Sequence, residues 1–162
     1  MLGRLGGMAI KGSSVRRLTP DDVGPVTVLQ RCCWVDEAIV NETLAIPALH
    51  ETLDDVRRWL GEWDTIGLWL DGRLLGMVRG RRIGDDWHLG RLAVVPDLRG
   101  QGVGRWLLQA GEAAADPQCR RVVLFTGAKS QGNIELYRSA GYAPIPSTEP
   151  GTVSLARVLR GD

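Results

Sequence analysis

The stretch of sequence that decides the fold reads R-G-Q-G-V-G-R and runs from Arg99 to Arg105. It follows a strand-like run at residues 92–95 and opens a helical pattern that reaches residue 115, so glycine stands where a strand turns into a helix. The first turn of a helix has N–H groups without intrahelical partners, and glycine lets a phosphate approach them without meeting a Cβ. The pattern predicts a pyrophosphate cradle formed by Arg99, Gly100, Gln101, Gly102, Val103, Gly104 and Arg105.

The spacing of these glycines excludes two other phosphate-binding loops. A dinucleotide fingerprint needs a third glycine three positions after the second, and Arg105 occupies that position. A nucleoside triphosphate loop ends in Gly-Lys-Ser or Gly-Lys-Thr, and no such ending follows these glycines. The remaining alternative is a glycine-rich helix start that binds no ligand, and the strand pattern before it and a second motif downstream argue against that.

The second motif spans residues 130–142 and reads S-Q-G-N-I-E-L-Y-R-S-A-G-Y. It predicts a helix that is capped by the hydroxyl of Ser130, ended by Gly141 and followed by a strand. Tyr137 lies on this helix.

Together the two motifs resemble those of the Gcn5-related N-acetyltransferases (GNAT). L-A-V-V-P precedes the glycine run, R-x-x-G-x-G lies within it and the Tyr137 motif follows, so the resemblance covers about residues 15–158. It implies an α+β (mixed α/β) fold, with a central, mostly antiparallel sheet that opens into a V-shaped splay and is flanked by about four helices. It also implies acetyl-CoA as the cosubstrate, a primary amine as the acceptor and no metal.

The resemblance assigns the role of general acid to Tyr137, which would protonate the sulfur of the leaving CoA. A thiol pKa of roughly 8.5 and a phenol pKa of roughly 10 leave little imbalance for this transfer, and the phenol stays protonated at neutral pH. The alternative is that Tyr137 only packs its ring against the sheet.

Backbone groups of the strand before the cradle complete the implied acyl-CoA site. By resemblance, the N–H of Leu92 polarises the thioester carbonyl as a one-donor oxyanion hole, and Ala93 and Val94 bind the pantetheine arm like an added strand. Many relatives also have an asparagine seven residues before the tyrosine, where this chain has Ser130, so an amide contact to the pantetheine falls to Asn133. The alternative for residues 92–95 is an ordinary buried strand.

A base must accept the proton of the attacking amine, and His88 occupies the place of the carboxylate base in histone-modifying relatives, four residues before Leu92. The ordinary pKa of histidine, roughly 6.5, leaves the imidazole neutral near pH 7. The alternatives are a packed or surface histidine and proton loss through water.

The charge pattern gives an independent indication about the acceptor. Between residues 34 and 64 the chain has eight acidic residues against two arginines, whereas the rest has eighteen basic residues against eleven acidic ones. In this fold that segment overhangs the acceptor side, so the pattern favours a cationic amine bound near Trp34, Asp36 and Glu37. The alternative is a solvated helix face beside core tryptophans.

Length and composition predict one domain in a reducing compartment. We expect a flexible leader at residues 1–14 and a single GNAT domain at 15–160. Three cysteines without metal-ligand spacing favour the cytoplasm, and no apolar run reaches the length of a membrane span or a signal peptide. We expect no nucleic acid or membrane partner, and a homodimer is one option for assembly.

The order of elements predicted along the chain agrees with the resemblance. The pattern predicts a strand at 15–18, a helix from residue 20 to Cys33, an irregular segment at 34–50 and a helix at 52–63. A hairpin turning at Asp71-Gly72 and a strand at 87–95 follow, and then a helix, a strand at 122–125, the Tyr137 helix and two strands.

The function that follows is an N-acetyltransferase, an acyltransferase that uses acetyl-CoA. The first alternative is a GNAT module that binds acyl-CoA without catalysis, because fold alone does not guarantee activity. The second is an interaction protein that has lost the ligand, and the complete glycine run argues against it.

Overall fold

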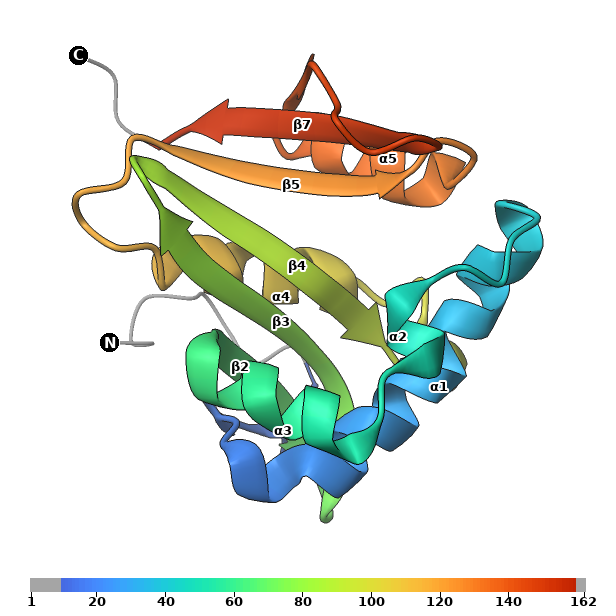
Figure 1. The fold of residues 1–162 in the computed structure, drawn as a ribbon. Coiled ribbons are helices and arrows are strands. Elements are labelled where there is room, and N and C mark those ends of the chain that lie inside the picture. Colours follow the sequence, from blue (N-terminus) through green and yellow to red (C-terminus); the bar gives the residue numbers. More distant parts are fainter. Residues whose placement is uncertain (1–9, 160–162) are drawn as a thin grey trace.

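A seven-stranded sheet forms the centre of the protein in a computed structural model that describes residues 10–159 (Figure 1). The strands lie in the order β1-β2-β3-β4-β5-β7-β6, and only the β4–β5 pair is parallel. The fold is thus the mostly antiparallel α+β arrangement that the sequence predicts. The strands are β1 (Ser14–Arg17), β2 (Asp64–Leu70), β3 (Arg73–Ile83), β4 (Asp86–Val94), β5 (Arg121–Gly127), β6 (Ala143–Ile145) and β7 (Thr152–Val158).

Helices cover both faces of the sheet. Helices α1 and α3 pack on one face of β2–β4, and α4 packs on the other (Figure 1). Two short 3-10 turns, Pro20–Asp22 and Pro96–Leu98, precede α1 and α4. The helices are α1 (Val23–Val40), α2 (Pro47–His50), α3 (Leu53–Glu62), α4 (Val103–Ala113) and α5 (Gln131–Ser139).

The core between the sheet and α4 depends on glycines that allow close packing. A Cβ on Gly80 would lie 2.4 Å from the ring of Trp87, so only glycine lets this indole lie flat on β3. The Trp87 Nε1–H donates to the backbone oxygen of Gly111 at 3.0 Å, which ties β4 to α4. Large, fully buried side chains form the core on both faces of the sheet, among them Leu68, Met77, Leu107, Leu108 and Leu155.

Strands β4 and β5 pair over three positions only, and the last pair joins His88 to Val123. Beyond that pair the two strands diverge, and Figure 1 shows the widening gap between their ribbons. The β3–β4 register also shifts here, because Arg91 and Leu92 together oppose one position of β3. Arg91 has φ +48°, a left-handed conformation that is strained for a non-glycine residue. The V-shaped splay is therefore confirmed, and β4 also has a bulge at its open end.

Capping boxes precede two helical segments, and the first helix is longer than predicted. Thr19 and Thr52 each form a capping box before a helical segment, and Asp71 and Gly72 take the positive φ values of a tight hairpin turn. The prediction that residues 34–50 are irregular was wrong, because α1 continues to Val40. No proline or glycine interrupts residues 34–40, so the α-helical hydrogen bonds between each N–H and the carbonyl four residues earlier continue.

The N-terminal part of the predicted leader, residues 1–9, lies outside the described residues. Residues 10–13 form a turn in which the Ser13 hydroxyl donates to the Ile10 carbonyl at 2.6 Å, and β1 begins at Ser14.

Candidate active site

The glycine run forms an open loop at the N-terminus of α4. Gly100 and Gly102 have φ values of +77° and +81°, and a Cβ on either residue would meet no atom within 4 Å. Gly102 is the N-cap of α4 and provides no side-chain cap, so the N–H groups of the first turn remain available to a ligand. The two glycines thus leave the helix dipole open on one side, as a pyrophosphate site requires.

The other residues of the run take different roles. A Cβ on Gly104 would lie 3.8–3.9 Å from Leu136 and Val94, so this glycine faces protein atoms rather than the open side of the loop. Val103 is buried in the core and Gln101 is exposed. Arg105 donates to the Ser139 hydroxyl of α5 at 2.5 Å, which fixes its guanidinium beside the loop.

Arg99 connects the cradle to α1. Its guanidinium forms an ion pair with Asp36 and donates to the Cys33 carbonyl at 3.3 Å. The longer α1 thus brings Asp36, a predicted acceptor-site residue, against Arg99, a predicted cofactor residue. Nothing in the local sequence indicates this contact, because the two residues lie 63 positions apart.

Tyr137 is buried on α5, the helix that follows β5. Its ring lies 6.0 Å from that of Tyr142, and its hydroxyl makes no hydrogen bond with residues 10–159. Burial, helped by the charge of Glu37, raises the pKa of Tyr137 above the ordinary phenol value. The phenol is therefore a proton donor at neutral pH, although it releases the proton less readily than a solvated phenol.

Glu37 forms a polar cluster with the helix that carries Tyr137. It accepts hydrogen bonds from the Ser130 hydroxyl and from Asn133 Nδ2, the latter at 3.2 Å. Asn133 also donates to the Thr126 hydroxyl at 3.2 Å. The prediction that the Ser130 hydroxyl caps α5 was wrong, because Glu37 and Asn41 are its partners instead. Glu37 thus orients α5 rather than lying free on the surface.

The bulged end of β4 lies against α1. The Val94 carbonyl accepts a hydrogen bond from Cys33 Sγ at 3.2 Å, and Ala93 is buried. Burial raises the pKa of the Cys33 thiol to about 11, so it stays protonated and suits this donor role. Leu92 follows Arg91 in the bulge, beyond the last β4–β5 pair, where strand β5 no longer pairs with β4.

His88 lies where the slot between β4 and β5 closes. It is half-buried, and burial lowers its pKa below the ordinary histidine value, although Asp86 opposes this shift. The imidazole is therefore neutral at pH 7 and able to accept a proton. The structure gives no hydrogen bond or ion pair between His88 and any other residue from 10 to 159.

A cluster of side chains around Glu51, on the same sheet face as His88, was not predicted from the sequence. Glu51 accepts hydrogen bonds from Arg91 at 2.5 Å, from Trp59 Nε1 at 2.8 Å and from Gln30 Nε2 at 3.3 Å. Arg91 also donates to Gln30 at 2.9 Å, and its guanidinium lies 5.8 Å from the ring of Trp34. The cluster brings together side chains from α1, α3, β3 and β4, which are distant in the sequence, so no local sequence motif indicates it.

The acidic segment does not present a row of free carboxylates. Every acidic side chain between residues 34 and 64 has a hydrogen-bond or ion-pair partner, and seven of the eight pair with an arginine or a lysine, whereas the partners of Glu37 among residues 10–159 are neutral. The partners are Arg99 for Asp36, Ser130 and Asn133 for Glu37, Lys129 for Glu42, Arg91 for Glu51, Arg57 for Asp54, Arg58 for Asp55, Arg81 for Glu62 and Arg17 for Asp64.

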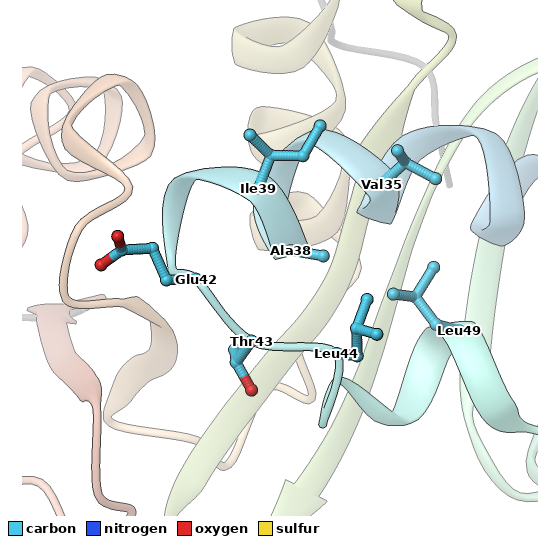
Figure 2. A pocket seen from close by; sticks show the side chains of 7 residues that line it. All are labelled: Val35, Ala38, Ile39, Glu42, Thr43, Leu44 and Leu49. Carbon is cyan, nitrogen blue, oxygen red and sulfur yellow. The ribbon is translucent and has the colours of Figure 1, made fainter.

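A mainly apolar hollow of about 310 Å³ lies between α1 and α2 (Figure 2). None of its lining residues belongs to the predicted site. They are Val35, Ala38, Ile39, Glu42, Thr43, Leu44 and Leu49.

Two properties of residues 10–159 bear on the predicted partners. No group of three or more histidine, cysteine or carboxylate side chains in that range could hold a metal ion. No helix in the same range is long and apolar enough to cross a membrane.

Comparisons with known proteins agree with this geometry. A model of the acetyltransferase (GNAT) family matches residues 30–142, which include the splay, the glycine run and Tyr137. The chain belongs to the GNAT family. No curated protein matches the sequence.

Solved structures of GNAT proteins share this fold at low sequence identity. The GNAT domain of S. lividans PAT is 22% identical with a TM-score of 0.76, and the match covers 91% of this chain and 90% of that one. An acetyltransferase from Thermus thermophilus is 19% identical with a TM-score of 0.74, covering 94% and 100%. The PaiA N-acetyltransferase from Thermoplasma acidophilum, solved in complex with coenzyme A, is 15% identical with a TM-score of 0.67, covering 90% and 98%.

Proposed function

We propose that this GNAT protein transfers the acetyl group of acetyl-CoA to a primary amine by direct attack. The observation that carries the proposal is the open N-terminus of α4, where Gly100 and Gly102 have positive φ values and empty space around them, next to the splayed end of β4. This arrangement suits a long ligand with a pyrophosphate at one end and an amide-bearing arm at the other. Acetyl-CoA has this shape and supplies an activated thioester.

The backbone of the site would hold this ligand with few side chains. The first-turn N–H groups at Val103, Gly104 and Arg105 face the pyrophosphate, and the unpaired edge of β4 at Ala93 and Val94 binds the pantetheine amides. Arg99 and Arg105, and the exposed Gln101, surround the phosphates. Asn133 contributes an amide at the other side of the slot.

Leu92, Tyr137 and His88 divide the chemistry among them. The Leu92 N–H donates to the thioester oxygen, which gains negative charge as the amine nitrogen bonds to the carbonyl carbon. The C–S bond then breaks, and Tyr137 gives its hydroxyl proton to the sulfur. His88, directly or through one water, accepts the proton that the amine nitrogen loses. One C–N bond replaces one C–S bond, and the protons that leave the amine and the phenol are accepted by His88 and by sulfur.

Two measurements test the proposal in sequence. CoA and acetyl-CoA at a hundred times the dissociation constant should stabilise the folded protein by about 2.7 kcal/mol, whereas NAD and ATP should not. Thiol release from acetyl-CoA should then depend on an added amine. CoA binding without amine-dependent thiol release would indicate a non-catalytic acyl-CoA-binding module, and no melting shift would contradict the whole assignment.

A further inference from the structure

Arg79 on β3 has a charged side chain without a polar partner. Its guanidinium lies between two indole rings, 4.5 Å from the centre of the Trp59 ring and 4.3 Å from that of Trp63. The side chain makes no hydrogen bond or ion pair with residues 10–159, and its Nε is closed off from solvent without a partner. The terminal nitrogens of Arg79 keep some contact with solvent, because only Nε is fully enclosed.

This arrangement is unfavourable for the protein alone. A guanidinium has five N–H donors, and the one on Arg79 Nε is enclosed without a hydrogen bond, which is costly. The carboxylate that could neutralise it, Glu51, already accepts from Arg91, Trp59 and Gln30. Burial and the neighbouring Arg91 lower the pKa of Arg79 to about 9, so it still carries its charge at pH 7. The cluster of Arg79, Arg91 and Glu51 thus keeps one excess positive charge.

The register of the sheet puts Arg79 beside the part of β4 that carries the proposed base and the proposed oxyanion donor. Arg79 pairs with Gly90 of β4, so the two side-chain positions share one face of the sheet. A Cβ on Gly90 would lie 3.7 Å from Arg79 Nε, which shows that the arginine side chain lies over this glycine. Gly90 stands midway between His88, the proposed base, and Leu92, the proposed oxyanion donor.

We propose that Arg79 binds a carboxylate of the acceptor, so that the acceptor is an amine that also bears a carboxylate, as an amino acid does. The proposal rests on the proposed function for the amine. A planar carboxylate matches the fork of one guanidinium in a bidentate pair, and a single negative charge matches the single excess positive charge of the cluster. The indoles of Trp59 and Trp63 hold the guanidinium in place, and its terminal nitrogens stay accessible to a ligand.

The kinetic test uses pairs of substrates that differ only by the carboxylate. Wild-type protein is assayed with lysine against cadaverine and with phenylalanine against phenethylamine. We expect kcat/KM to be at least about tenfold higher for the carboxylate-bearing member, the size of one charge-assisted contact. Arg79→Met, which keeps an unbranched side chain between the indoles, should abolish this ratio mainly through a higher KM.

Arg81→Met is the matched control. Arg81 lies on the same face, two residues along β3, and stacks on Trp63 at 4.8 Å, but Glu62 is its ion-pair partner at 3.8 Å. We expect this variant to keep the substrate ratio of the wild type. If both variants lost the preference for the carboxylate-bearing substrate equally, the preference would come from the overall positive charge of this face. That result would contradict a specific role of Arg79.

A binding measurement separates this proposal from the proposed function. Propionate is titrated into the CoA-bound protein while tryptophan fluorescence is recorded, because Trp59 and Trp63 flank the guanidinium. A saturable change in wild type and in Arg81→Met, but not in Arg79→Met, would support the anion site even if no amine were acetylated. Absence of that change, or equal kcat/KM for both members of each substrate pair, would overturn the proposal.

Arg79→Met should also melt at or above the wild-type temperature in the absence of ligand, because an unpaired charge is removed. A lower melting temperature would show that Arg79 serves the fold, and would contradict a role reserved for a ligand.

Discussion

The cradle at residues 99–105 and the arginine cluster around Glu51 are built in opposite ways. In the cradle, one contiguous stretch presents backbone donors on an open surface, with glycines where a side chain would intervene. In the cluster, side chains from α1, α3, β3 and β4 meet in a half-buried space, and Glu51 lies just before α3. The cradle suits a cofactor with a fixed shape, and we propose that the cluster selects the acceptor.

The comparison separates recognition of the cofactor from recognition of the acceptor. Backbone donors recognise phosphates whatever the neighbouring side chains are, so relatives with the same cradle can differ in acceptor. The cluster holds Arg91, a strained residue with φ +48°, by two hydrogen bonds to Gln30 and Glu51. Changes in the cluster should therefore affect folding and acceptor choice, and changes in the cradle should affect CoA binding.

The largest expected effect is on the cradle. Gly102→Asp puts a side chain and a negative charge against the phosphates and should abolish the stabilisation by CoA, about 4.1 kcal/mol at a thousand times the dissociation constant. Gly72→Asp is the control, because Gly72 also has positive φ and open surroundings but lies in the β2–β3 turn. Thermal melts with and without CoA measure both. A normal CoA shift in folded Gly102→Asp would show that the pyrophosphate binds elsewhere.

Substitution of Glu51 in the cluster should lower the free energy of unfolding and leave CoA binding unchanged. Glu51→Gln leaves Arg91 and Arg79 without a negative charge and should lower the free energy of unfolding by about 3 kcal/mol, the lower end for a broken buried pair. Glu62→Gln breaks the exposed 3.8 Å pair with Arg81 and should cost roughly 0–1 kcal/mol. Urea unfolding at pH 7 compares them. Equal losses would mean that the cluster is as solvated as the surface.

The next effect tests the chemistry between the two regions. Tyr137→Phe keeps the ring and should bind CoA normally, yet turnover should fall roughly a hundredfold, the size expected for loss of a general acid. Tyr142→Phe, the same change 6.0 Å away, removes a hydroxyl that donates to Glu112 and should affect stability instead. Single-turnover rates isolate the chemical step. An unchanged rate in Tyr137→Phe would remove the phenol from the mechanism.

The smallest expected effect concerns pH. Because burial lowers the pKa of His88, this base is deprotonated at pH 7, and kcat/KM should decline only as the pH falls through a value below roughly 6.5. His88→Gln should lower kcat/KM by about tenfold, less than the roughly hundredfold or more typical of a general base because water can still take the proton, and should flatten this acidic limb. We would measure kcat/KM of both proteins from about pH 5 to about pH 8. A second substrate, an amine that is already uncharged over this range, serves as the control because it has no ammonium proton to lose. An identical limb in both proteins would assign the proton to water.

The sequence predicts the strand, open glycine loop and helix of the proposed cradle because their determinants are local. Gly100, Gly102 and the start of the helix that follows are neighbours in the sequence, and periodicity reveals the strand before them. The arginine cluster could not be found in this way, because Arg79 and Trp59 meet only after β3 and α3 pack. The pairing of the acidic segment could not be found for the same reason. Counting charges cannot reveal that Asp36 pairs with Arg99 across 63 residues.

The central claim is acetyl transfer, and it is tested most directly by mass spectrometry of amines incubated with acetyl-CoA and the wild-type protein. The set should include free amino acids, their decarboxylated analogues, polyamines, aminoglycosides and lysine peptides, with released thiol measured in the same samples. We expect one acetyl group on an amine nitrogen for each thiol released, with carboxylate-bearing amines preferred. Tight binding of acetyl-CoA with no acetylated amine and no amine-dependent thiol release would contradict it.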